Sequence, residues 1–224
     1  MKITQVIALD GPVASGKSTV GRLVARKLGY RFLDTGAMYR AFALLSLQTG
    51  MDTKDKARLV DLAHQHTMDV ALQEDGSTHI LVDGQDVTSL LRDPKVEERV
   101  SQVSMVPGVR EVMVSLQRRV AEDGSIVLAG RDIGTVVLPE APLKVFLTAS
   151  ASERAQRRFK ELQALGQDVT YEKVLQEMTE RDKMDSERKV APLRPSPDAR
   201  VIVTDNCSAE EVVNLIISLA RARR

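Results

Sequence analysis

The chain of 224 residues is poor in cysteine and aromatic residues and carries almost no net charge. A single cysteine, Cys207, excludes an internal disulfide framework and suits a reducing compartment. Aromatic residues make up 3% of the chain, too few for the stacking platforms of proteins that bind single-stranded nucleic acid. The 32 basic and 31 acidic residues leave a net charge of +1, so no overall field attracts nucleic acid or an anionic membrane.

Long apolar segments are also missing. No run reaches the ~18 consecutive apolar residues of a membrane-spanning helix, and no basic stretch precedes a long apolar segment near the first residue. The three histidines, His64, His66 and His79, form no metal-ligand pattern with cysteine or carboxylates. We therefore expect a soluble, cytoplasmic, monomeric protein with neither nucleic-acid nor membrane partners.

A strong phosphate-binding motif stands close to the first residue. Residues 11–19 read GPVASGKST, a G-x-x-x-x-G-K-[ST] loop between an apolar run and a helical pattern. Glycines allow the tight turn in which backbone N–H groups point at phosphate oxygens. Lys17 is expected to meet the β- and γ-phosphates, and Ser18 to offer its hydroxyl to Mg²⁺. The candidate ATP-binding residues are Gly11, Pro12, Val13, Ala14, Ser15, Gly16, Lys17, Ser18 and Thr19.

Strands and helices alternate along the chain. The runs at 6–9, 30–33, 126–129, 144–147 and 200–203 are short, apolar and bounded by Gly, Pro or Asp. With long connections between them, they predict an α/β fold, a five-stranded parallel sheet with helices on both faces. A helix is expected over 39–47. Two further runs, 70–72 and 79–82, flank a turn-rich segment and predict a small antiparallel β insert.

Three further groups of residues could bind a second anion. DTGAMYR, at 34–40, leaves the second strand and brings the Thr35 hydroxyl and helix N–H groups to a strand's carboxyl end. GRDIGT, at 130–135, follows another strand, so Arg131 and Asp132 should emerge at the edge that holds the phosphate loop. The third group consists of two helical faces with spacings of three and four: Arg154, Arg157 and Arg158, and then Arg181, Asp185 and Arg188. Such a face, taken alone, is more typical of a solvated helix, and it gains weight here only from the two other anion-binding turns.

Together these motifs resemble the bacterial cytidylate kinases of the nucleoside monophosphate kinase group. The resemblance rests on LDGPVASGKST, LDTGAMYRA, SQVS, VRE, GRDIGTVV, ERDKMDSER with the following VAPL, and the β insert, in the same order over about residues 7–193. It implies transfer of the γ-phosphoryl group of ATP, with Mg²⁺, to CMP or dCMP. It also implies one P-loop kinase unit over 1–224, with a core of 1–66 and 106–224, a nucleoside-binding insert at about 67–105 and a helical lid at about 154–166.

The resemblance also implies roles for individual residues. Arg40, Arg131 and Arg188 would clamp the acceptor phosphate, in a substrate site that also includes Thr35 and Arg181. Lys17, Arg181 and a lid arginine, Arg157 or Arg158, would neutralise the transferred group. Ser101, Arg110 and Asp132 would meet the cytosine edge, and Asp185 the ribose. No general base is expected, because the acceptor is already an anionic phosphate oxygen.

The sequence departs from the family's usual pattern in two places. Val13, Ala14 and Ser15 stand where its loop is richer in Gly and Ala, and Glu187 replaces a commonly neutral side chain. Other functions stay open: a kinase for UMP, AMP or shikimate, or an ATP-binding module without transfer activity. A GTPase is disfavoured because the N-K-x-D pattern is absent.

Overall fold

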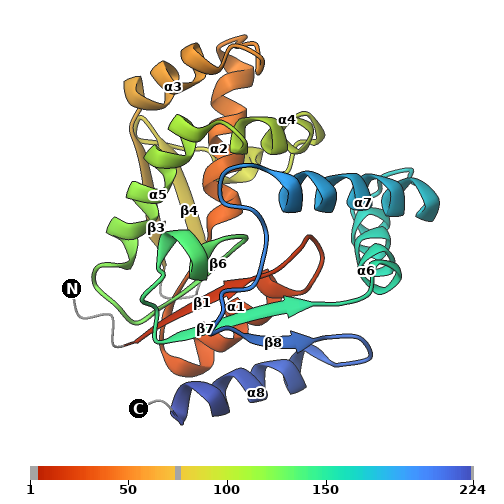
Figure 1. Cartoon of the computed structure of the whole chain (residues 1–224). Helices are drawn as coiled ribbons and strands as arrows, with labels where there is room; N and C mark the ends of the chain where they lie inside the picture. Colours follow the sequence, from red (N-terminus) through yellow and green to blue (C-terminus); the bar gives the residue numbers. More distant parts are fainter. Residues whose placement is uncertain (1–4, 74–76, 223–224) are drawn as a thin grey trace.

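A five-stranded parallel sheet forms the centre of the protein (Figure 1). The computed structural model describes residues 5–73 and 77–222. The strand order is β2 (Arg31–Asp34), β6 (Ile126–Gly130), β1 (Val6–Asp10), β7 (Leu143–Thr148) and β8 (Arg200–Val203), with all neighbours parallel. This confirms the predicted sheet, and each strand overlaps its predicted run.

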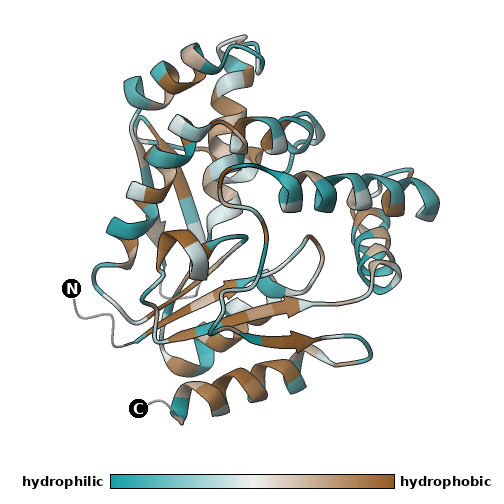
Figure 2. Cartoon of the chain, viewed as in Figure 1, coloured by the Kyte–Doolittle hydropathy of each residue, from teal (hydrophilic) through white to brown (hydrophobic). Residues whose placement is uncertain are grey.

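Helices cover both faces of the sheet because its central strands carry apolar side chains on both sides along most of their length. Every residue of β1 and β6 is buried, and successive side chains of a strand point to opposite faces. Val6 and Ala8 join the core under α2 (Thr35–Gln48) and α5 (Pro107–Ala121). Ile7 and Leu9 join the core under α1 (Lys17–Leu28) and α8 (Ala209–Arg221). The continuous apolar runs thus reflect burial on two sides. Figure 2 shows the hydrophobic character of these strands in brown.

Helix α2 is longer than the predicted helix over 39–47. It begins at Thr35, directly after β2, because Asp34 caps its first turn: Asp34 Oδ1 accepts a hydrogen bond from Gly36 N at 3.0 Å. The helix therefore starts at the carboxyl edge of the sheet, the edge at which β1 meets α1.

The predicted β insert is present and shares the core. Strands β3 (Met68–Leu72), β4 (Thr78–Val82) and β5 (Gln85–Asp86) form an antiparallel sheet, framed by α3 (Lys56–Gln65), the short η1 (Thr88–Leu90) and α4 (Pro94–Ser104). Ile80 of β4 and Val96 of α4 are fully buried in the cluster that also contains Phe42 of α2. The insert is thus packed onto the core helices, and its boundaries at 67 and 105 stay a prediction.

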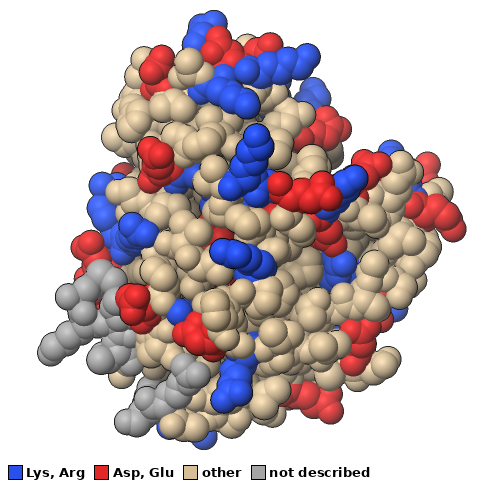
Figure 3. Space-filling view, viewed as in Figure 1, with Lys and Arg blue, Asp and Glu red and all other residues tan. Residues whose placement is uncertain are grey.

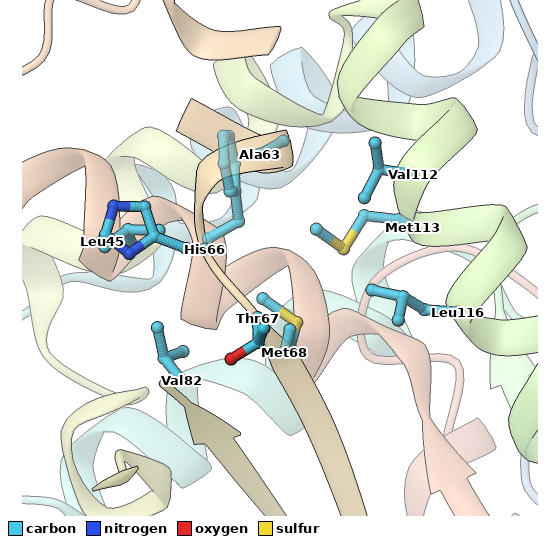
Figure 4. Close-up of a pocket in the computed structure, with 10 residues that line it drawn as sticks. Leu45, Ala63, His66, Thr67, Met68, Val82, Val112, Met113 and Leu116 are labelled. Carbon is cyan, nitrogen blue, oxygen red and sulfur yellow. The ribbon is translucent and has the colours of Figure 1, made fainter. Parts of the chain in front are cut away.

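A small apolar pocket lies at this junction (Figure 4). Figure 4 shows Met113 and Leu116 of α5 turned toward Met68 of β3, with Val82 of β4 nearby. His66 lies at its rim and is held by the Asp83 carboxylate, 2.6 Å from Nδ1. The pocket is a packing gap between the insert and α5, at a distance from the motifs that carry the chemistry.

Helices α6 (Ala151–Ala164) and α7 (Tyr171–Glu187) form an arm beside the sheet (Figure 1). They pack on each other through a separate cluster that includes Ala155, Leu162, Val174 and Met178, and both are largely hydrophilic elsewhere (Figure 2). Val13 and Ala14 of the phosphate loop pack against the same cluster. The arm therefore rests on the loop itself, and it is longer than the lid predicted at 154–166.

Charges are mixed over the surface. Figure 3 shows basic and acidic side chains interspersed on the face that it presents, in keeping with the net charge of +1. Within residues 5–73 and 77–222, no helix is both long and apolar enough to cross a membrane.

Candidate active site

The phosphate loop joins β1 to α1 in the geometry that its glycines predict. Gly16, with φ 89°, is left-handed just before α1, a conformation that only glycine adopts without strain. A Cβ at Gly11 would lie 2.1 Å from the carbonyl oxygen of Leu147, so β7 also demands glycine there. Lys17 Nζ donates a hydrogen bond across the loop to Pro12 O, at 2.8 Å. Burial, followed by the charges of Arg131 and Arg181, lowers the pKa of Lys17 well below its usual value.

A hydroxyl and a carboxylate meet beside this loop. Ser18 Oγ donates to Asp34 Oδ2 at 2.8 Å, while the other oxygen of Asp34 caps α2. Burial would raise the pKa of Asp34, but Arg40, Ser18 and Lys17 outweigh it, and the pKa lies below its usual value. An ionised carboxylate and a hydroxyl are oxygen ligands of the kind that Mg²⁺ takes together with substrate phosphates and water. The pair therefore fits Mg²⁺, although the described residues contain no cluster of three or more His, Cys, Asp or Glu for a metal.

Two buried side chains brace the sheet edge. Asp10, at the end of β1, accepts hydrogen bonds from Ile133 N at 2.7 Å and Gly134 N at 2.8 Å, and so fixes the π-helical turn η2 (Ile133–Val137) after β6. Burial raises the pKa of Asp10 to about 6. The Thr35 hydroxyl donates to Ala129 O at 3.0 Å and so ties α2 to β6. The predicted substrate role of Thr35 stays a prediction.

The predicted base-reading residues form a buried ion pair. Arg110 of α5 donates to the Asp132 carboxylate, and their side chains are 4% and 7% exposed. The guanidinium of Arg110 also lies 5.6 Å from the centroid of the Tyr39 ring, and Arg188 Nη2 lies 3.7 Å from the other Asp132 oxygen. Sequence positions 110, 132 and 188 thus meet in one desolvated cluster.

Ser101 lies on α4, one turn before the backbone that holds Arg110. The Ser104 hydroxyl donates to Ser101 O at 2.9 Å, and Ser104 O accepts from Arg110 Nη1 at 3.3 Å. The predicted contact of the Ser101 hydroxyl with a base stays a prediction.

Helix α7 brings a second set of charges to the same edge. Arg131 Nε donates to Asp185 Oδ2 at 2.9 Å, and Arg188 Nη1 lies 4.0 Å from the other oxygen. Burial opposes ionisation of Asp185, but Arg131 and its neighbours hold the pKa below its usual value. Arg181 and Asp185 share a face of α7 as predicted, whereas Arg188 is the C-cap residue that follows the helix. The Nε of Arg181 is buried and has no hydrogen-bond partner in the described part of the chain, so it retains a donor for an anion.

The arm arginines differ in what they contact. Arg157 donates to Thr204 O at 2.7 Å, and its guanidinium passes close to Gly16, where an added Cβ would be 4.0 Å from Nη1. Arg158 pairs with Glu161 on its own helix at 2.9 Å. The roles of Arg157 and Arg158 toward a transferred phosphate stay predictions, and the structure brings only Arg157 of these two beside the phosphate loop.

Arg154 was predicted only as a member of a possible anion-binding face, without a role of its own, and it holds the arm on the loop. Its side chain is buried and donates to Val13 O at 3.2 Å and Ala149 O at 3.0 Å. It also pairs with Asp182 of α7 at 2.6 Å. The helical spacing placed Arg154 on the face of Arg157 and Arg158, but only the folded contacts distinguish its role.

Comparison with known proteins identifies the family. The family model described as cytidylate kinase matches residues 7–222. The chain belongs to the cytidylate kinase family. The cytidylate kinase of Pelotomaculum thermopropionicum is 46% identical over 218 residues, which cover 97% of this chain and 96% of that protein.

Some relatives are longer proteins whose names give two activities. The bifunctional pantoate ligase/cytidylate kinase of Synechococcus sp. (strain JA-3-3Ab) is 50% identical over 218 residues. These residues cover 96% of this chain and 40% of that longer protein. Among solved structures, an uncharacterized protein from Eubacterium ventriosum aligns with a TM-score of 0.56 and 14% identity, over 98% of this chain and 99% of that one. That likeness shows a shared fold.

Two carboxylates of this cytidylate kinase family member were missed in the sequence, Asp10 and Glu97. Glu97 of α4 lies between Arg40 Nε, at 3.2 Å, and Arg181 Nη1, at 3.4 Å. Glu97 stands in none of the quoted motifs, whereas Asp10 is part of LDGPVASGKST but received no role from it. Asp10 directly precedes the glycine of the phosphate loop, which was the one available signal for it.

Proposed function

We propose that this chain transfers the γ-phosphoryl group of ATP to CMP or dCMP, giving ADP and CDP or dCDP. The observation that carries the proposal is the buried Arg110 and Asp132 pair, which lies at the sheet edge that also holds the phosphate loop. Cytosine presents an amine donor at C4 and acceptors at N3 and O2. A carboxylate and a guanidinium are the matching partners, whereas uracil, with an acceptor at C4 and a donor at N3, would be mispaired.

In the proposed reaction, positively charged side chains stabilise the transition state. Phosphoryl transfer passes through a loose transition state with charge spread over equatorial oxygens, so the protein contributes position and charge. Lys17 and Arg181 would stabilise the transferred group, together with Arg157 or Arg158. Arg40, Arg131 and Arg188 would hold the acceptor phosphate, each with a fork of donors suited to two oxygens.

The carboxylates keep these cations in place before the nucleotides bind. Asp185 holds Arg131, and Asp132 holds Arg110 and approaches Arg188. Because these groups are already oriented, little reorganisation is needed when the phosphates arrive. In the proposed complex, Asp185 would also meet the ribose.

Ser18 and Asp34 are the proposed protein ligands for Mg²⁺. Mg²⁺ bound with ATP neutralises charge on the phosphate oxygens during transfer. The Ser18 hydroxyl and the ionised Asp34 carboxylate already lie 2.8 Å apart beside the loop. Asp34 is the acidic residue that the sequence alone did not identify for this role.

We also propose a single kinase unit that works as a cytoplasmic monomer on small nucleotides, with no nucleic-acid or membrane partner. The insert at about 67–105 would bind the nucleoside, and the arm that includes 154–166 would close over the phosphates. Closure would exclude water, which otherwise competes with the acceptor for the γ-phosphoryl group.

A coupled ADP-release assay with ATP and CMP, dCMP, UMP, AMP or shikimate as acceptor tests the proposal. We expect kcat/KM for CMP to exceed that for UMP at least about a hundredfold, because the mispaired base leaves buried polar groups unsatisfied. Equal turnover of UMP or AMP would contradict the assignment of the acceptor. ADP release that no acceptor stimulates would instead indicate an ATP-binding module without transfer activity.

A further inference from the structure

One carboxylate bridges two of the phosphate-binding arginines. Glu97 lies on α4 of the insert. Its Oε1 lies 3.2 Å from Arg40 Nε, and its Oε2 lies 3.4 Å from Arg181 Nη1. Arg40 belongs to α2 and Arg181 to α7, so the bridge joins the core, the insert and the arm. All three side chains are partly buried, between 21% and 27% exposed. Figure 1 shows α4 and α7 as neighbours at this place.

Electrostatics explains why a carboxylate is held there. Burial and the charge of Arg131 lower the pKa of Arg181, and Arg40 adds to this repulsion, while Glu97 opposes it. A carboxylate forked between two guanidinium groups satisfies them much as a phosphate would, with two oxygens facing two sets of donors. A phosphate and the Glu97 carboxylate cannot both occupy this position without like-charge repulsion at close range.

We propose that Glu97 is an internal substitute for the substrate phosphate, which holds Arg40 and Arg181 until the acceptor nucleotide displaces it. This inference rests on the proposed function, and it adds a residue that sets the affinity for the acceptor. While Glu97 occupies the arginines, only the fraction of molecules with the bridge open can bind the phosphate fully. The apparent dissociation constant is therefore the intrinsic constant divided by that fraction, and so is raised.

The inference predicts an effect that depends on the phosphate of the ligand. Neutral Gln at position 97 keeps the shape of the side chain but removes the competing charge. Glu97→Gln should bind CMP about three- to tenfold more tightly than the unmodified chain, the range expected for two partly exposed ion pairs that must open first. Cytidine, which has the same base and sugar without the phosphate, should bind equally to both.

The neighbouring Glu98 provides the matched control. It lies on the same helix, is exposed, and forms no ion pair within the part of the chain that the structure describes. Glu98→Gln makes the same change in net charge without opening the bridge. Its affinity for CMP should therefore stay close to that of the unmodified chain.

Isothermal titration of CMP and cytidine into the unmodified chain, Glu97→Gln and Glu98→Gln decides the question. Thermal melts establish that each protein is folded. Glu97→Ala is a second variant that also removes the competing charge. Equal CMP affinity in the Glu97→Gln and Glu98→Gln proteins would overturn the inference, and so would weaker CMP binding in Glu97→Gln. A parallel gain for cytidine would overturn it too, because it would indicate a change in the insert itself. Failure of the unmodified chain to bind CMP would overturn the proposed function and the inference with it.

Discussion

Replacement of Asp132 by asparagine should convert a cytosine-selective kinase into a weaker and less selective one. The Asp132 carboxylate is buried with Arg110, and Arg188 approaches its second oxygen at 3.7 Å. Asparagine keeps the shape but has one acceptor oxygen, and its NH₂ group can donate to O4 of uracil. We expect the preference for CMP over UMP to fall from at least about a hundredfold to below about tenfold, mainly through loss of turnover with CMP.

The same substitution should destabilise the fold. Removing one partner of a buried ion pair costs roughly 3–5 kcal/mol, because the other charge is left buried. Arg110 keeps its hydrogen bond to Ser104 O, at 3.3 Å, and its contact with the Tyr39 ring. These remaining contacts should hold the loss in free energy of unfolding to about 2–4 kcal/mol.

Two measurements separate these effects. Steady-state kcat/KM for CMP and UMP gives the selectivity, and urea denaturation gives the stability. Asp123→Asn is the control, because it makes the same charge change at the amino end of β6, where Asp123 is 85% exposed beside Arg31. It should leave both quantities nearly unchanged. If Asp132→Asn lowers kcat/KM equally for CMP and UMP, so that the ratio of the two values is unchanged, Asp132 acts by holding Arg110 and Arg188. Its assignment as a residue that reads the base is then wrong.

Three further predictions follow from the loop, the arm and the buried strand end. Lys17→Ala should lower turnover by several orders of magnitude in a folded protein, since the charge stabilises the transition state; near-normal turnover would contradict the phosphate-loop role. Amide hydrogen exchange of β3, β4 and residues 154–166 should slow when ATP and CMP are bound together, and ATP hydrolysis without acceptor should be slow. Exchange rates that are the same with and without both ligands would exclude closure. Burial raises the pKa of Asp10 from 3.8 to about 6, so the folded protein holds the Asp10 proton more tightly than the unfolded chain does. The contribution of Asp10 to the free energy of unfolding is therefore full below about pH 4 and is lost as the pH rises through about 6. Urea denaturation of the unmodified chain should therefore show a free energy of unfolding that falls by about 3 kcal/mol more between pH 4 and pH 7 than in Asp10→Asn; parallel profiles would refute the shift.

The sequence by itself determined the sheet, the phosphate loop and the insert, because each depends on local patterns. The apolar runs of β1 and β6 can only be buried on both faces, and Gly16 must supply a left-handed residue before α1. The spacing of Arg181 and Asp185 places them on one face of a helix whatever the rest of the chain does. The range 39–47 started α2 too late, whereas the motif at 34–40 already led from the strand into a helix, and the Asp34 cap sets its first residue.

Only the tertiary structure decided which charged groups meet. Helical periodicity says that Arg154, Arg157 and Arg158 share a side, but the packing of α6 on the loop decides that Arg154 contacts Val13, 141 residues away. Glu97, which stands in none of the quoted motifs, lies 84 residues from Arg181, and the two meet because α4 and α7 lie side by side. Ion pairs between distant segments depend on how whole elements pack, and a one-dimensional pattern specifies the face of an element without specifying what that face contacts.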